Sequence, residues 1–289
     1  MLFPRLGVIG AGVIGAGVAQ LFIQSGHEVI LVDTDARRLA EAQREMVRNM
    51  RLFQMLQKSP GTRNSVDRLQ PSVELAALGG VDFVIENVTE DWNVKTSVHR
   101  ALDQVIGAAV PVGVNTSAIP ITRLASLHRH SERVIGMHFM NPAPLMPTVE
   151  IIRGACTTDA TVVAATALVE QAGRTAIVVK DSPGFVTNRV MMLMVNEAIF
   201  LVHEGVSTVQ DVDRLFKTCF GHKMGPLETA DLIGLDTVLR SIEVIYEELN
   251  DSKYRPCPLL KTMVYAGWLG RKNNRGFYTY QNTAPTSPP

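Results

Sequence analysis

One imidazole and one carboxylate stand out in an otherwise apolar stretch of this 289-residue chain. His138 and Glu150 lie in GMHFMNPAPLMPTVEII, residues 136–152. Histidine titrates near neutral pH and therefore suits proton abstraction. If the segment folds back between residues 141 and 147, Glu150 reaches one imidazole nitrogen, fixes the tautomer and stabilises the imidazolium. The spacing thus predicts a general base with its partner, or else a structural pair within the core.

His138 is favoured over six other histidines because it ends a predicted strand at 133–139. In open α/β sheets, ligands bind at the carboxyl ends of the strands. The remaining histidines are assigned to a turn, to a polar loop or to helices and their ends: His27, His99, His128, His130, His203 and His222.

The letters GAGVIG, residues 10–15, match the dinucleotide-binding pattern G-x-G-x-x-G. The pattern follows a strand-like run and opens a helix-like run, which is the context that the chemistry requires. Gly10 permits a tight turn, Gly12 lets the backbone approach a pyrophosphate, and Gly15 lets helix and strand pack closely. The alternative, a glycine-rich turn without a ligand, is disfavoured by this context.

Asp33 ends the next predicted strand and sets the predicted choice of cofactor. Its carboxylate would accept hydrogen bonds from ribose hydroxyls and repel a 2′-phosphate, which favours NAD over NADP. Arg37 and Arg38 lie nearby and weaken that preference, and FAD is excluded less firmly. With His138 as the base, the residues predict oxidation of an alcohol by hydride transfer to NAD.

Two further polar clusters follow predicted strand ends. The letters NTS, residues 115–117, end one strand and include Ser117, and Glu90 follows another strand. Both clusters also fit ordinary turn and cap chemistry. Asn188 falls one turn into a predicted helix, where an inward-facing amide is unusual.

Strand-like and helix-like segments alternate over the first 181 residues. The predicted strands are 5–12, 27–33, 81–88, 110–116, 133–139, 147–154 and 175–181. The predicted helices between them are 13–26, 36–56, 94–106 and 158–173. This alternation predicts an α/β fold, a Rossmann-type doubly wound and mostly parallel sheet with helices on both faces.

After Pro183 we expect no further strand. Helices are predicted at 185–205, 208–220, 227–250 and 258–267. We therefore expect an NAD-binding domain at residues 1–181, an all-α C-terminal domain at 182–281 and a disordered, proline-rich tail at 282–289.

The composition limits the kinds of partner. Basic and acidic residues balance, 28 against 28, so bulk charge attracts neither nucleic acid nor an anionic membrane. The most apolar run, 189–205, carries Asn196 and Glu197 at its centre and is too polar and too short to span a bilayer. We expect no secretory signal. Three scattered cysteines favour a reducing cytoplasm over a disulfide framework or a metal site.

Six motifs in order resemble the 3-hydroxyacyl-CoA dehydrogenase family over nearly the whole chain. They are IGAGVIGAGVA, NTSAIPIT, GMHFMNPAPLMPTVEII, KDSPGFVTNRV, MGPLETADLIGLDT and GRKNNRGFYTY. The resemblance implies an NAD-binding domain followed by a helical domain that builds most of a homodimer. It implies that His138 is the general base, that Glu150 is its partner and that Ser117 hydrogen-bonds the substrate oxygen. It also implies the reaction-site residues Asn141 and Asn188, and the cofactor-contacting positions Glu90, Lys95 and Lys272.

The same resemblance assigns the helix at 36–56 to an arm near the CoA. Basic residues in this helix and just beyond it would meet phosphates or form a solvated face: Arg44, Arg48, Arg51 and Lys58.

Some residues depart from the commonest family pattern. ENVTE carries Asn87 and Thr89 where EA-x-x-E is common, and Val114 precedes NTS where serine is frequent. FGHKMGPL replaces NHPMGPL. These departures resemble a branch found with polyketide pathways, thought to oxidise a short 3-hydroxy unit such as glyceryl on an acyl carrier protein. Both CoA and an acyl carrier protein therefore stay open as the handle of the thioester.

The predicted function is NAD-dependent oxidation of the 3-hydroxyl of a short 3-hydroxyacyl thioester. One alternative is a non-catalytic NAD-binding relative, as the lens crystallins of this superfamily are. The intact His138–Glu150 pair, together with Ser117 and Asn188, argues against it, because a protein freed from catalysis has no physical reason to retain them all. A second alternative is a dehydrogenase of another small 3-hydroxy compound, such as carnitine or a sugar acid, which only the motif resemblance disfavours.

Overall fold

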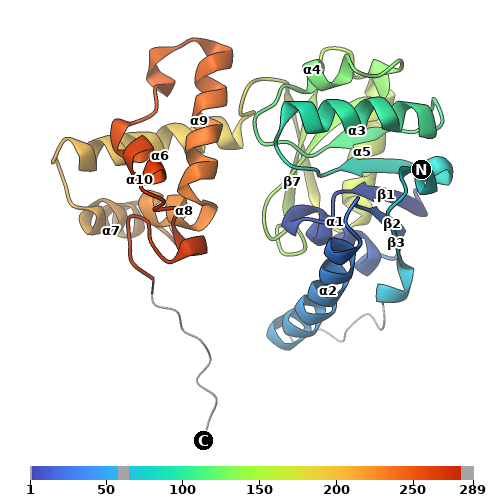
Figure 1. Ribbon diagram of the computed structural model, residues 1–289, viewed down its shortest axis with the longest axis horizontal. Helices are drawn as coiled ribbons and strands as arrows, with labels where there is room; N and C mark the ends of the chain where they lie inside the picture. Colours follow the sequence, from blue (N-terminus) through green and yellow to red (C-terminus); the bar gives the residue numbers. More distant parts are fainter. Residues whose placement is uncertain (1, 58–64, 281–289) are drawn as a thin grey trace, which may run out of the picture. The chain divides into compact units, whose positions relative to one another are not determined.

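The structure is a computed structural model that describes residues 2–57 and 65–280 (Figure 1). The tail predicted at 282–289 and Lys58 lie outside the described residues. The chain divides into two compact units between Ser182 and Pro183, one residue after the predicted boundary.

An eight-stranded sheet forms the centre of the first unit, in the order β3-β2-β1-β4-β5-β6-β7-β8. Its strands are β1 (Arg5–Ile9), β2 (Glu28–Val32), β3 (Leu69–Ser72), β4 (Phe83–Glu86), β5 (Val112–Val114), β6 (Val134–Phe139), β7 (Thr148–Arg153) and β8 (Thr175–Lys180). Neighbouring strands are parallel except β6 and β7, which are antiparallel. The chain order reverses between β1 and β4, which places a ligand-binding crevice at their carboxyl ends.

The strand β3 is not predicted by the sequence pattern. Its four residues, LQPS, include Pro71, and only Leu69 is buried. It pairs with β2 alone, at the edge of the sheet. An edge strand tolerates proline because one of its sides needs no hydrogen-bond donor. The hydrophobic alternation that would signal a strand is therefore missing here.

Helices connect the strands of this unit: α1 (Val13–Gln24), α2 (Ala36–Gln57), α3 (Trp92–Val105), the unpredicted short α4 (Ile121–Ala125) and α5 (Asp159–Gln171). The helices α1, α2 and α5 share one apolar core with the sheet, in which Phe22, Met46 and Leu168 are buried. Asp91 begins α3 by accepting two backbone N–H groups of the first turn. The predicted Rossmann-type architecture is thus confirmed.

The second unit is built from α6 (Thr187–His203), α7 (Val209–Phe220), α8 (Pro226–Ile233), α9 (Leu235–Leu249) and α10 (Pro258–Tyr265). These helices bury a core of their own, which includes Val195, Leu227 and Ile242. Over its described residues, 183–280, extended pairing is limited to isolated bridges near the C-terminal end. The expected all-α domain is confirmed.

The prediction of a single helix at 227–250 is wrong. The chain forms α8 and α9 with a break at Gly234, whose φ of +100° is incompatible with a continuing helix. The turn brings the start of α9 beside Lys272, which pairs with Asp236. Helical periodicity continues across the break, so the sequence pattern conceals it.

The polar centre of the apolar run at 189–205 has a structural explanation in α6. Asn196 is buried, its Nδ2 donates to the Arg255 carbonyl at 2.9 Å, and its Oδ1 accepts the Cys257 N–H at 2.9 Å. This amide fastens the segment before α10 to α6. None of the helices found in residues 2–57 and 65–280 is long and apolar enough to cross a membrane.

Candidate active site

A cavity of about 670 Å³ lies at the carboxyl ends of β1, β2, β4 and β5. Apolar side chains of Val73, Leu75 and Val98 form part of its wall. Residues singled out from the sequence form another part: Gly10, Gly12, Asp33, Glu90 and Ser117. A cavity of this size and mixed lining is typical of a site for a small molecule or cofactor.

The glycines at the start of α1 shape one wall of this cavity. Gly10 has a φ of +95°, which favours glycine, and its N–H donates to the Val32 carbonyl at 2.7 Å. A Cβ on Gly15 would lie 1.9 Å from the Gly10 carbonyl oxygen. Nothing lies within 4 Å of a Cβ built on Gly12. The first turn of α1 carries no acidic side chain, so its N–H groups fit the phosphates of a dinucleotide.

Asp33 lies at the cavity wall just after β2. Its Oδ2 accepts the Ala11 N–H at 2.8 Å, which ties the carboxylate to the glycine turn. Arg38 lines the same cavity, whereas the exposed Arg37 pairs with Asp35. One carboxylate and one guanidinium therefore line the same cavity.

Replacing Asp33 with alanine should shift cofactor preference from NAD toward NADP. The variant loses charge-assisted hydrogen bonds to the ribose and no longer repels a 2′-phosphate. We therefore expect kcat/KM for NAD, divided by kcat/KM for NADP, to fall by roughly tenfold to a hundredfold. The ratio is measured with both cofactors at a fixed substrate concentration. Asp35→Ala is the control, since it removes the same charge two residues away. An unchanged ratio would mean that Arg38 sets the preference.

His138 and Glu150 meet across the antiparallel pair β6 and β7, whose register sets them directly opposite each other. The imidazole Nδ1 and Glu150 Oε2 lie 3.1 Å apart, and each side chain is only 5% exposed. The segment thus folds back as predicted. Because the carboxylate accepts a hydrogen bond from the Nδ1–H group, the neutral ring has its basic nitrogen at Nε2. A buried carboxylate also stabilises the imidazolium that forms when the ring takes up a proton.

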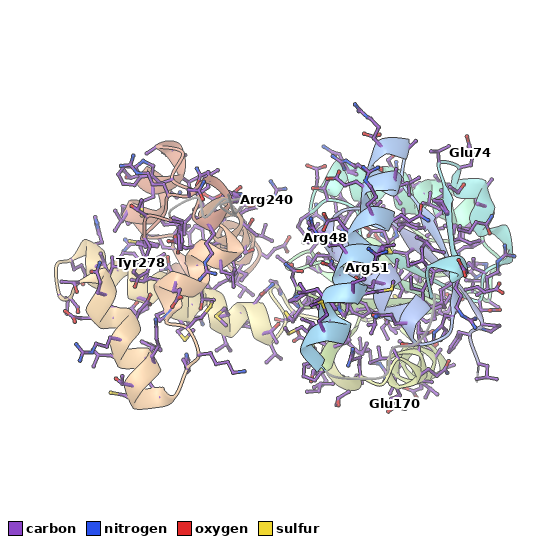
Figure 2. The ribbon with its side chains drawn as sticks, turned by 90° about the horizontal axis from the view of Figure 1, so that it is seen from below. Arg48, Arg51, Glu74, Glu170, Arg240 and Tyr278 are labelled. Carbon is purple, nitrogen blue, oxygen red and sulfur yellow. The ribbon has the colours of Figure 1, made fainter. Side chains whose placement is uncertain are left out.

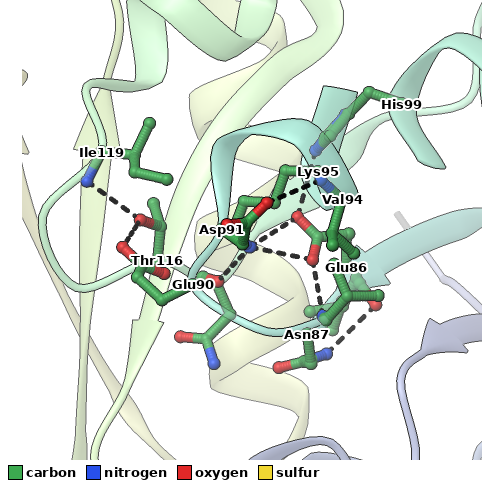
Figure 3. A network of polar contacts seen from close by, with 12 residues as sticks. Glu86, Asn87, Glu90, Asp91, Val94, Lys95, His99, Thr116 and Ile119 are labelled. Carbon is green, nitrogen blue, oxygen red and sulfur yellow. Dashed lines mark hydrogen bonds and ion pairs between the residues drawn. The ribbon is translucent and has the colours of Figure 1, made fainter. Parts of the chain in front are cut away.

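Glu90 joins the loops that follow β4 and β5. Its Oε1 accepts the Thr116 hydroxyl (Figure 3). The same oxygen accepts the N–H groups of Ser117 and Ala118 at 3.2 Å each. The half-buried Ser117 is thereby held at the cavity wall. The site therefore combines a dinucleotide-type crevice, an imidazole–carboxylate pair and a fixed hydroxyl in one unit.

Comparison with known proteins agrees with this arrangement. A family model described as "3-hydroxyacyl-CoA dehydrogenase, NAD binding domain" matches residues 5–182, and the C-terminal domain model of the same family matches residues 184–280. The chain belongs to the 3-hydroxyacyl-CoA dehydrogenase family. The predictions of this family and of NAD as its cofactor are confirmed.

Members of the 3-hydroxyacyl-CoA dehydrogenase family resemble this chain over nearly its full length. It is 42% identical over 285 residues to a probable 3-hydroxybutyryl-CoA dehydrogenase of Bacillus subtilis, covering 97% of this chain and 99% of that protein. It is 43% identical over 288 residues to the 3-hydroxybutyryl-CoA dehydrogenase of Bradyrhizobium diazoefficiens, covering 98% of each. The crystal structure of (S)-3-hydroxybutyryl-CoA dehydrogenase from Ralstonia eutropha is similar, with a TM-score of 0.92 and 38% identity, covering 97% of this chain and all of that chain.

Lys95, one of the family positions expected to contact the cofactor, is enclosed in this structure. Its ammonium is fully buried and donates to both oxygens of Glu86 at 2.9 Å and to the Asn115 carbonyl at 3.1 Å (Figure 3). An ammonium has three donors, and all three are used. In the described arrangement these donors are all used within the protein, and the contact of Lys95 with the cofactor stays a prediction.

His99 and His128 also differ from their predicted surroundings. Sequence patterns assign them to a helix with polar neighbours and a polar loop, but both are buried. His99 Nε2 lies 3.0 Å from Glu86 Oε2, and His99 Nδ1 lies 2.7 Å from His128 Nε2. Lys95 and His99 are one turn apart on α3, so both face Glu86. Burial opposes the ionised form, but these two neighbours outweigh it and hold the pKa of Glu86 below its usual range.

The buried His128 predicts a pH dependence of stability for this family member. Burial, aided by the charges of His99 and Arg133, lowers its pKa to about 4. The unfolded chain therefore binds a proton below about pH 6.5 that the folded chain does not, so stability present above that pH is lost as pH falls toward 4. The expected loss is on the order of 3 kcal/mol of unfolding free energy.

Urea unfolding of wild type and His128→Gln between about pH 7 and pH 4.5 measures this effect. The free energy of unfolding should fall less with pH in the variant. His130→Gln is the matched control, because that imidazole is 44% exposed. Equal slopes in wild type and His128→Gln would exclude His128 as the source.

The other site residues predicted from the family lie elsewhere. Asn141 is exposed and lines a second cavity, of about 340 Å³, between α1, α2 and the loop after β6. Asn188 lies in the first turn of α6 and Lys272 pairs with Asp236, both within the second unit. Throughout the described parts of the chain, no group of His, Cys, Asp and Glu side chains is arranged to hold a metal ion.

Proposed function

We propose that this chain is an NAD-dependent dehydrogenase that oxidises the 3-hydroxyl of a short 3-hydroxyacyl thioester such as 3-hydroxybutyryl-CoA. The observation that carries the proposal is the buried His138–Glu150 pair. His138 lies on β6, next to the strand β5 that leads into the dinucleotide-type cavity. The names of the Bacillus and Bradyrhizobium relatives support the substrate class.

The main site residues of the first unit have the following proposed roles. The glycine turn and Asp33 hold the cofactor's phosphates and ribose, and bound NAD supplies the two-electron oxidising power. His138 takes the proton of the substrate hydroxyl through Nε2. Glu150 keeps the opposite nitrogen protonated and stabilises the imidazolium. The Ser117 hydroxyl donates a hydrogen bond to the substrate oxygen.

Two residues of the second unit keep the roles that the family resemblance implies. The Asn188 amide would bind the substrate thioester, and Lys272 would contact the cofactor. Within its own unit, Lys272 is held by Asp236 beside the break at Gly234, so its position depends on that turn.

In the first unit, Asn141 and Glu90 are proposed to line the cofactor side, since both lie on loops after sheet strands.

The handle of the thioester is proposed to be CoA, received by the cavity between α1 and α2. Asn49 and Phe53 line this cavity, and Arg48 and Arg51 extend from the same helix (Figure 2). Guanidinium groups suit phosphate recognition. An acyl carrier protein presents a phosphate-linked arm as well, so the handle is decided by comparing the two substrates directly.

NADH formation from 3-hydroxybutyryl-CoA and from a glyceryl unit on its carrier protein, measured side by side, tests the proposal. Efficient turnover of the CoA ester is expected. Turnover of the carrier-bound unit alone would assign the protein to the polyketide branch. Turnover of free carnitine or a sugar acid, without either thioester, would contradict the proposed substrate class.

A homodimer formed through the second unit is also proposed. Large apolar side chains are exposed on its helices: Val190, Leu215, Phe220, Leu232 and Tyr265. Such residues are enriched where a surface is covered by a partner. Light scattering of the purified protein should give twice the chain mass of 31.6 kDa.

A further inference from the structure

The strand β6, which carries His138, extends beyond the end of its neighbour β5. The parallel pairing of β5 and β6 ends at Val114 opposite Gly136, whereas β6 continues to Phe139. The last residues of β6 therefore have no strand partner on the β5 side. Phe139 is only 4% exposed, and a buried N–H without an acceptor is costly.

A side chain replaces the missing strand. Oδ1 of Asn115, the residue that follows β5, accepts the Phe139 N–H at 3.1 Å. This contact extends the hydrogen-bond ladder beyond the end of β5. On its other side, β6 is paired with β7 from Gly136 to Phe139, the register that sets His138 opposite Glu150. The end of β6 is thus held from both sides at the position of His138.

Asn115 is itself firmly held. Its N–H donates to the Glu86 carbonyl at 2.8 Å, and its own carbonyl accepts the Lys95 ammonium at 3.1 Å. Lys95 is fixed in turn by the buried Glu86 carboxylate, which His99 also contacts (Figure 3). The buried charged cluster behind the cavity therefore anchors the residue that holds the end of β6.

We propose that Asn115 is a positioning residue for His138. It touches no reacting atom in this account; it fixes the backbone next to the imidazole so that Nε2 meets the substrate hydroxyl. The inference rests on the proposed function of His138 as the base. A displacement of about 1 Å at such a group costs up to roughly a hundredfold in rate.

Asn115→Ala removes the acceptor, and Asn115→Asp keeps an oxygen at the same place. We expect Asn115→Ala to lower kcat by roughly tenfold to a hundredfold with KM for the thioester and NAD changed by less than about threefold. Asn115→Asp should recover most of that loss. Amide hydrogen exchange of the protein without substrate supplies an independent readout, because the Phe139 N–H should exchange faster in Asn115→Ala alone.

Thr157→Val is the matched control. The buried Thr157 hydroxyl donates to the Val134 carbonyl and accepts the Gly154 N–H, so this variant loosens the opposite end of β6. It should cost comparable thermal stability and leave kcat within about threefold. Equal kcat in Asn115→Ala and Thr157→Val, or no recovery in Asn115→Asp, would overturn the inference.

His138→Gln is measured in the same series. If it loses activity while Asn115→Ala does not, only the positioning role is wrong. If it retains full turnover, the proposed base is wrong and the inference falls with it.

Discussion

Replacing His138 with glutamine should lower kcat by roughly two or more orders of magnitude while NAD still binds. The substitution removes the group that takes the hydroxyl proton, and general-base catalysis typically contributes about 10²–10⁴-fold. The cavity that carries the glycine turn and Asp33 does not include His138 among its lining residues, so cofactor affinity should change little. Steady-state rates with 3-hydroxybutyryl-CoA, together with calorimetric titration of NAD, measure the two effects separately.

A second buried imidazole in the same unit provides the control for this experiment. His27 contacts the Phe22 carbonyl and the aromatic ring of the same residue, away from the cavity. His27→Gln should keep kcat within about threefold, even if it costs stability. Retained turnover in His138→Gln would remove this residue from the mechanism.

Glu150→Gln should lower kcat by roughly one to three orders of magnitude. The amide preserves the shape of the side chain but removes the charge that stabilises the imidazolium in a site only 5% exposed. Low local polarity makes such a counter-charge more effective than it is in water. The unaltered rate of a folded Glu150→Gln protein would reduce the pair to a structural contact.

A double variant distinguishes a shared role from two separate ones. If Glu150 acts only through His138, the variant with both substitutions should be no slower than His138→Gln alone. Additive losses would instead give Glu150 a task of its own at the site. The thermal unfolding midpoints of all three proteins show whether a lower rate comes from a folding defect or from a lost catalytic group.

The Rossmann-type unit could be predicted from sequence because its elements obey strong periodicities. Buried strands such as EVILV and the glycine turn before α1 produce clear local signals. β3 was missed since Pro71 and its polar neighbours form an exposed edge strand. The break at Gly234 is not visible in the sequence pattern because α8 and α9 both bury apolar residues in the same core. The helical spacing of apolar residues therefore continues across the break.

The His138–Glu150 contact could also be predicted, for a physical reason. Two residues twelve positions apart in adjacent apolar runs become neighbours when the runs pair as an antiparallel hairpin, and a buried carboxylate requires such a partner. The sequence pattern did not show which pair of strands would be antiparallel. The register of β6 and β7 supplies that information.

The buried cluster behind the cavity could not be predicted in the same way. Charged side chains such as that of Lys95 are usually exposed to solvent. From sequence, the helix face that carries Lys95 is therefore predicted to be a polar surface. Its partner Glu86 ends β4, its partner Asn115 follows β5, and His128 follows a short helix. Only the packing of α3 against the ends of β4 and β5 brings them together. The one local signal was a carboxylate at the end of the apolar strand FVIE.

The most direct test of the central claim follows the hydrogen on C3 of the substrate. The purified protein is given NAD and 3-hydroxybutyryl-CoA that carries deuterium at C3, and the reduced cofactor is examined by mass spectrometry. The account predicts acetoacetyl-CoA and a reduced cofactor that carries the deuterium, with little of either product in His138→Gln. Absence of reduced cofactor, or reduced cofactor without deuterium, would contradict oxidation of the 3-hydroxyl by direct hydride transfer.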